Sequence, residues 1–319
     1  MSGIVGHITY ALLSHRKSQE HRLSCAAIIS QHFDHYLSGA YLGVDIMTLP
    51  GGVCPECGQE WGYCASMPKT CPDDGAPLTP YVLNHAGESY PSIDIHRAYY
   101  GRTHLIFGWH QDEHLCMTWD DLPEFFGACL ADANEPAEKA YVLGFISHVV
   151  GDCMIKSFQP GLKLHLLNGT YTPQNRPIQD LYSYHEVGIA ELGVDWPSLM
   201  ESVVATPVQT IQAHYMRCAE PSGTLAEKFP EGWRPELKSL LMSVMAENRR
   251  YQRIRNVRLL EELKLKDGPE GPECDAGLSM TAEGLNYREM LSLCRESDFR
   301  AALDTIAEET AVMFGSASK

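Results

Sequence analysis

A histidine and an aspartate four residues apart lie in the apolar segment YVLGFISHVVGD, residues 141–152. His148 and Asp152 would project from the same face of a helix, one turn from each other. A buried carboxylate costs several kcal/mol unless it is paired or bound to a metal. Imidazole and carboxylate at this spacing make a suitable pair of zinc ligands. On spacing alone, a buried hydrogen bond between the two side chains is the simpler interpretation.

Three further residues occupy places where they could act with this HxxxD pair. His7 lies near the apolar face of a helix expected over residues 4–15, so its ring is predicted to point inward. Asp45 stands among apolar residues, where a carboxylate caps, forms a salt bridge, or serves as a metal ligand or general base. His104 directly precedes the apolar run LIF and is therefore positioned to enter the core.

A later helix, expected over residues 178–192, carries His185 next to apolar neighbours, which predicts an inward orientation. Two glutamates lie near this histidine in the sequence. Glu191 is six residues further on, a poor helical spacing for a shared metal ion, and Glu186 points about 100° away. Whether either glutamate binds a metal is left open by the sequence.

The segment 53–78, VCPECGQEWGYCASMPKTCPDDGAPL, differs in character from the rest of the chain. Cys54-Pro-Glu-Cys57-Gly has the thiolate spacing of a zinc knuckle, and its glycine permits the tight turn. A similar knuckle begins at Cys71 but lacks its second cysteine, so we expect Cys64 as the fourth ligand and Asp74 as the next choice. A zinc ion with four protein ligands has no open coordination position for catalysis. The segment is therefore predicted to be a zinc ribbon that staples an inserted loop, with partner binding as the alternative.

The composition is that of a globular chain of 319 residues, with 44% hydrophobic and 21% charged residues. A net charge of -16 argues against a general nucleic-acid-binding surface, although a phosphate ester could bind through metal ions. No apolar run reaches the ~18 residues of a membrane span. The 11 cysteines and the N-terminal sequence, which is not typical of a signal peptide, favour the cytoplasm.

The apolar and polar pattern predicts an all-α chain with a small inserted ribbon. Helices are expected over residues 4–15, 20–37, 139–160 and 178–192, throughout much of the chain beyond Trp196, and over 281–312. The expected domains are a helical metal-binding domain (1–52 and 79–266), the ribbon (53–78), and a linker with a C-terminal helix (267–319). Residues 267–277 are rich in Gly, Pro and Glu and read as the linker.

The order of these motifs resembles the zinc-dependent phospholipase C and S1/P1 nuclease superfamily. The matching features are an early His7, the turn Gly39-Ala40-(x)4-Asp45, His104 before an apolar run, and the HxxxD helix. They cover roughly residues 4–195, interrupted by the ribbon. The resemblance implies a multi-helix bundle with a multinuclear zinc site at the bottom of a cleft.

The resemblance also implies a ligand set. His104, His148 and Asp152 would hold one zinc ion, and Asp152 would bridge to a second ion that His7 also binds. Asp45 would lie beside the pair as a ligand or general base. Secreted members of the family add a processed terminal amine as a ligand, and this chain shows no processing signal.

Two departures from the family pattern affect a third zinc ion, to which His185 would contribute. The histidine before proline that often follows the HxxxD pair is replaced by Gln159-Pro160. The residue four positions after His185 is Ile189, where the family has a carboxylate. We therefore expect two zinc ions in the helical site and one in the ribbon.

These observations predict a metal-dependent hydrolase of small phosphate esters, with a phosphodiesterase or phospholipase C-like activity. Paired metals lower the pKa of a bridging water and neutralise charge on a phosphoryl oxygen. Asp152 would act as the bridging ligand, and Asp45 could orient or deprotonate the attacking water. The alternative is a non-catalytic, zinc-stabilised protein whose degraded site serves partner binding.

Overall fold

The computed structural model describes residues 3–41, 49–62, 68–95, 119–155, 174–211, 240–269 and 271–318. These residues are mostly helical, as the sequence predicts. The chain divides into two compact units. Unit 1 comprises residues 1–41, 119–205 and 255–319, and unit 2 comprises residues 42–118 and 206–254.

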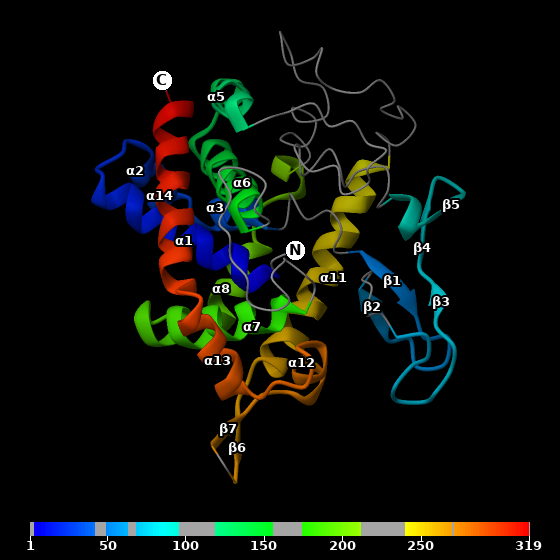
Figure 1. Ribbon diagram of the computed structural model, residues 1–319. Helices are drawn as coiled ribbons and strands as arrows, with labels where there is room; N and C mark the ends of the chain where they lie inside the picture. The colour runs from blue at the N-terminus through cyan, green and yellow to red at the C-terminus, as the bar shows by residue number, and fades with distance from the viewer. Residues whose placement is uncertain are drawn as a thin grey trace. The chain divides into compact units, whose positions relative to one another are not determined.

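The described residues of unit 1 form helices and a short hairpin (Figure 1). Its first elements are α1 (Ile4–Glu20), α2 (Cys25–Gln31), α3 (Phe33–Ala40), η1 (Trp119–Asp121), α5 (Leu122–Asp132) and α6 (Pro136–Ile155). They are followed by α7 (Asn175–Tyr182), the π-helical segment η2 (Ser183–Glu191) and α8 (Trp196–Val203). The hairpin β6 (Lys266–Gly268) and β7 (Gly271–Glu273) precedes α12 (Ala276–Thr281), α13 (Tyr287–Glu296) and α14 (Phe299–Ala317).

Helix α6 is the centre of unit 1, because every residue from Ala140 to Ile155 is buried. It packs against α1, α2, α3, α5 and α14 (Figure 1). A helix that is apolar on all sides belongs in the interior. The polar residues that α6 carries, His148 and Asp152 among them, are therefore held away from solvent.

Helices α3 and α6 approach each other closely at a pair of glycines. A Cβ atom on Gly39 would collide with the carbonyl oxygen of Tyr141, and one on Gly144 would collide with the carbonyl oxygen of Tyr36. Each helix thus presents a glycine to the backbone of the other, which lets their axes come close. This crossing places the end of α3 beside the ligand-bearing part of α6.

Helix α1 meets α6 at a third glycine. A Cβ on Gly151 would collide with the ring of Tyr10, which is fully buried. Tyr10 lies edge-on to the ring of His7, with centroids 5.7 Å apart. The contact therefore fixes the face of α1 that carries His7 against the last turns of α6.

Unit 2 contains the predicted ribbon. Strands β1 (Pro50–Val53), β2 (Glu60–Gly62) and β3 (Thr79–Pro80) form an antiparallel sheet in the order β2-β1-β3. A hairpin of β4 (Val82–His85) and β5 (Glu88–Pro91) follows. Helix α11 (Leu241–Glu262) belongs to unit 2 up to residue 254 and to unit 1 from residue 255.

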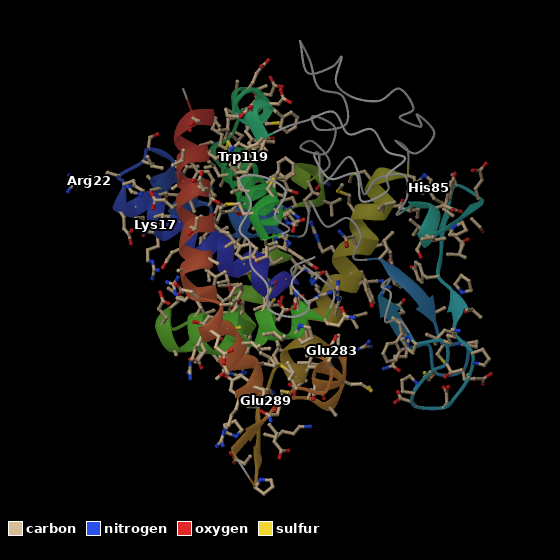
Figure 2. All side chains as sticks on the ribbon, viewed as in Figure 1. Lys17, Arg22, His85, Trp119, Glu283 and Glu289 are labelled. Carbon is tan, nitrogen blue, oxygen red and sulfur yellow. The ribbon has the colours of Figure 1, made fainter. Side chains whose placement is uncertain are left out.

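Within unit 2, the N-terminal half of α11 is tied to the strands by polar contacts. Arg250 donates to Glu60 of β2 and to Glu247, and the Tyr81 hydroxyl donates to Glu247 at 2.5 Å. The Nδ1 atom of His85, labelled in Figure 2, lies 2.8 Å from the hydroxyl of Ser243. Arg250 and Glu247 of this helix therefore link it to the strands of unit 2.

Several predicted helix boundaries are wrong. Helix α1 continues to Glu20 instead of ending near residue 15, because its polar extension consists of good helix formers and Lys17 pairs with Glu20 at 2.9 Å (Figure 2). The helix expected over 20–37 is two helices, since His32 leaves the helical region with φ −125° and ψ 47°. The helix expected over 281–312 breaks between α13 and α14 at Asp298, whose φ is 52°.

Two further predicted segments, the helix 178–192 and the linker 267–277, also differ from the structure. The helix expected over 178–192 begins earlier, as α7, and its second half is π-helical. The expected linker 267–277 overlaps the β6–β7 hairpin and the start of α12, which Asp275 caps by accepting from Gly277 N–H. Among the described helices, none is long and apolar enough to cross a membrane.

Candidate metal centres

His7, His148 and Asp152 converge in the interior of unit 1. The ligand atoms of the three side chains lie within 4.8 Å of one another, and the exposed fractions are 2%, 1% and 0%. The two imidazole rings stack, with centroids 3.8 Å apart and planes 3° apart. Two positively charged rings at this separation would repel each other, so the stack favours at least one neutral ring that can bind a cation.

Each histidine faces a different oxygen of the same carboxylate. His7 Nε2 lies 3.5 Å from Asp152 Oδ1, and His148 Nε2 lies 3.9 Å from Asp152 Oδ2. Both separations exceed the usual length of a direct N–H···O hydrogen bond. Two ligands on one tetrahedral zinc ion, each about 2.1 Å from it, lie about 3.4 Å apart. The spacing of His7 and Asp152 therefore fits a shared ion, and a donor set of two imidazoles and one carboxylate fits zinc.

The orientation of His148 is fixed from the other side of its ring. Its Nδ1 atom lies 2.8 Å from the carbonyl oxygen of Ala40, at the end of α3. A carbonyl can only accept, so Nδ1 carries a proton, and in the neutral ring Nε2 then presents a lone pair towards Asp152. Metal-binding histidines are commonly held this way. The glycine crossing of α3 and α6 is what brings Ala40 within reach.

Sequence reasoning missed the part that glycines have in building this centre. Gly39 was expected in a turn but lies within α3. Gly144 and Gly151 look ordinary in the sequence, but each of the three glycines lies at a close contact between helices. A glycine inside a strongly apolar helical pattern costs about 1 kcal/mol relative to alanine, which is the signal that could have drawn attention to two of them.

The structure brings together His7, His148 and Asp152 from the predicted ligand set. Asp45 and His104 lie outside the described residues, and so do Cys64 and the Gln159-Pro160 step.

His185 belongs to neither of the groups that could hold a metal in the described parts of the chain. Its Nε2–H donates to the carbonyl oxygen of Leu263 at 2.8 Å, and its ring contacts Tyr184 and Tyr287. Burial lowers the pKa of His185. These contacts describe a neutral packing residue that orders η2 against the end of α11.

The glutamates near His185 make surface contacts. Glu191 accepts from Arg300 at 2.7 Å and from Arg16 at 2.8 Å, and these bonds lower its pKa. Glu186 lies near the Tyr287 hydroxyl and Arg295. Like His185, both lie outside the two groups of possible metal ligands in the described chain.

The second group lies in the ribbon, where Cys54, Cys57, Cys71 and Asp74 place their ligand atoms within 4.8 Å of one another. Cys57 Sγ lies 3.7 Å from Cys71 Sγ, and Cys54 Sγ lies 3.2 Å from Asp74 Oδ2. Two thiolates on one tetrahedral zinc ion lie about 3.8 Å apart. The three sulfur atoms and the carboxylate are therefore arranged as ligands of a single ion would be.

The pKa values of Asp74 and Cys57 depend on nearby backbone N–H groups and on the other residues of this group. The backbone N–H of Ala76, at 2.9 Å from Oδ1, and the Cys54 thiol hold the pKa of Asp74 below its usual range. The backbone N–H of Gln59 favours the Cys57 thiolate, yet local desolvation of the sulfur and its hydrogen bonds with the adjacent thiols and carboxylate raise the pKa of Cys57 to about 12. Metal binding at this group would therefore release protons from the thiols.

The fold and the two groups define a mainly helical protein with two candidate metal centres. Comparisons with protein-family models, with curated proteins and with solved structures found no match to this chain. Support for the two centres therefore comes from the residues and geometry of this chain alone.

Proposed function

We propose that the protein is a metal-dependent hydrolase of phosphate esters, with its centre at His7, His148 and Asp152. The observation that carries the proposal is the shared carboxylate, with His7 and His148 Nε2 at 3.5 Å and 3.9 Å from its two oxygens. One oxygen faces each histidine, so Asp152 would hold zinc together with both imidazoles. The order of motifs that resembles phospholipase C and S1/P1 nucleases supports the same class.

The residues of this chain have distinct parts in the proposed reaction. Asp152 and the two histidines would hold zinc, leaving a coordination position for water or substrate. Bound zinc supplies Lewis acidity, which activates water and neutralises charge on the phosphoryl group. The Ala40 carbonyl keeps the Nε2 lone pair of His148 directed inward. Burial of all three side chains strengthens their electrostatic interactions.

Two residues outside the described part of the chain complete the proposal. His104 is proposed as a further zinc ligand, and Asp45 as the group that orients or deprotonates the attacking water. The substrate would be a small phosphate ester, and a phosphodiester fits the resemblance best.

Metal analysis combined with anomalous scattering at the zinc edge tests the proposal. The expected result is two zinc ions beside His7, His148 and Asp152, with hydrolysis of an aryl phosphodiester that depends on them. A chain that holds a single zinc ion, located in the ribbon, would overturn it. Hydrolysis that survives complete removal of zinc would do the same.

The burial of the centre favours a second candidate function. His7, His148 and Asp152 are at most 2% exposed, and a metal enclosed to this degree suits a structural role. The protein would then be a zinc-stabilised protein without turnover, whose site serves folding and partner binding. Zinc bound at the centre, with no open coordination position and no hydrolysis of any phosphate ester tested, would establish this alternative.

A further inference from the structure

The ribbon contains two knuckles with the same backbone structure. The first knuckle is residues 54–58 and the second is residues 71–75. In each, the glycine N–H donates to the carbonyl of the leading cysteine, at 3.0 Å in the first and 2.8 Å in the second. The N–H of the leading cysteine donates to the residue after the glycine, at 2.8 Å in both. The final glycine of each knuckle has φ +74°.

Because the knuckles match residue for residue, each position in one has a counterpart in the other. Cys54 corresponds to Cys71, and Cys57 corresponds to Asp74. The burial follows the same pairing, since the two leading cysteines are buried while Cys57 and Asp74 are exposed. Asp74 therefore occupies the position from which the first knuckle supplies its second thiolate.

The side chain of Asp74 is directed at the three sulfur atoms. Its Oδ2 and Oδ1 atoms lie 3.2 Å and 3.5 Å from Cys54 Sγ. A thiolate and a carboxylate oxygen on one tetrahedral zinc ion lie about 3.6 Å apart. The Ala76 N–H also donates to Oδ1 at 2.9 Å, which orients the carboxylate in this direction.

We infer that the ribbon binds one zinc ion through Cys54, Cys57, Cys71 and Asp74, with Asp74 in place of Cys64 as the fourth ligand. This site is separate from the proposed catalytic centre and stands whether or not the protein hydrolyses phosphate esters. Three soft thiolates and one hard carboxylate hold the ion. The carboxylate lies on the exposed side, where an outside ligand can displace it. The ion is therefore more readily exchanged than one held by four thiolates.

Titration of the metal-free full-length chain with Co²⁺ tests this ligand set. Thiolate-to-cobalt charge-transfer absorption reports on the ribbon, because the described residues of the other centre are two histidines and an aspartate. We expect Cys64→Ser to leave this absorption unchanged and Asp74→Cys to raise it by about one third, as a fourth thiolate replaces the carboxylate. Asp74→Ala should weaken Co²⁺ binding about tenfold or more, since the loss of an outer-shell partner alone costs at least that.

Exchange provides a second measurement on the same variants. A chelator should remove zinc from the ribbon of the native chain faster than from Asp74→Cys. If Cys64→Ser lowers the absorption and Asp74→Cys does not raise it, Cys64 is the fourth ligand and the inference is wrong. Absence of thiolate absorption in the native chain would also overturn it. Asp74→Cys keeps four ligands by exchanging the carboxylate for a thiolate, so the test does not depend on a destabilised variant.

Discussion

The rings of His7 and His148 stack face to face, with 3.8 Å between centroids and 3° between planes. One ring comes from the first helix of the chain and the other from the buried helix α6. In the stacked pair, His7 Nε2 lies nearest Oδ1 of Asp152 and His148 Nε2 lies nearest Oδ2. Two imidazoles and a carboxylate with this arrangement form a candidate metal centre.

Replacing Asp152 tests the shared carboxylate. Asp152→Asn keeps the shape of the side chain but removes its charge and one oxygen. We expect loss of aryl phosphodiester hydrolysis and a fall in zinc content of more than one equivalent, because the carboxylate would serve both ions. Asp267→Asn on the exposed strand β6 is the matched control and should change neither quantity. Activity that survives Asp152→Asn would exclude the bridging role.

The glycine crossing predicts a coupling between packing and metal affinity. Gly144→Ala forces a methyl group onto the carbonyl of Tyr36, so we expect a loss of about 3 kcal/mol in the free energy of unfolding. Zinc affinity should fall about 10- to 100-fold, because the shift of α3 moves Ala40 away from His148. Urea unfolding and competitive zinc titration measure the two effects.

Gly315 provides the control for that substitution. It lies in α14, and a methyl group at this position would have open space around it within 4 Å. Gly315→Ala should therefore leave zinc affinity unchanged and stabilise the protein by up to about 1 kcal/mol, through helix propensity. A similar loss of zinc affinity in both variants would show that the crossing of α3 and α6 does not position the ligands.

The environment of His185 predicts a pH dependence of stability. Burial lowers the pKa of this histidine in the folded protein, while in the unfolded chain it is about 6.5. Below pH ~6.5 the unfolded chain takes up a proton that the folded chain does not, so the free energy of unfolding falls as the pH falls. We expect His185→Gln to reduce this slope, measured by urea unfolding between pH 7.5 and 5.5.

The same variant tests whether His185 binds a metal. Because its Nε2–H donates to Leu263, we expect His185→Gln to retain the zinc content of the native chain. Loss of one equivalent of zinc would show instead that His185 binds a third zinc ion, as the family resemblance implies.

Disrupting the ribbon should separate stability from turnover. Cys54→Ser removes a buried ribbon ligand, and we expect loss of the ribbon ion together with lower thermal stability. The folded fraction should keep its rate of hydrolysis, since His7, His148 and Asp152 belong to unit 1. Cys274→Ser, at a half-buried cysteine outside both groups, should retain the ion. Loss of turnover in fully folded Cys54→Ser would place the ribbon in the catalytic site.

Sequence patterns predicted much of the local structure and part of each centre. The apolar pattern of residues 139–160 indicated a buried helix, and α6 is buried from Ala140 to Ile155, where the described part of this stretch ends. Helix ends were less well predicted, as at Glu20 and Asp298. The polar residues after residue 15 extend α1 without an apolar pattern, and the break before α14 depends on one left-handed residue.

The sequence by itself determined that His148 and Asp152 share a helix face, because a four-residue spacing places them one turn apart in any α-helix. It likewise determined the first ribbon knuckle, whose two cysteines lie within one tight turn. Only the tertiary structure brought His7 to this pair, since helix packing across Gly144 and Gly151 decides which distant segments meet. The sequence showed that the second knuckle lacks its second cysteine, and it left Asp74 as the next choice after Cys64. Only the tertiary structure showed that the two knuckles share their backbone hydrogen bonds and that Asp74 points at Cys54 Sγ, because residue types alone do not specify these contacts.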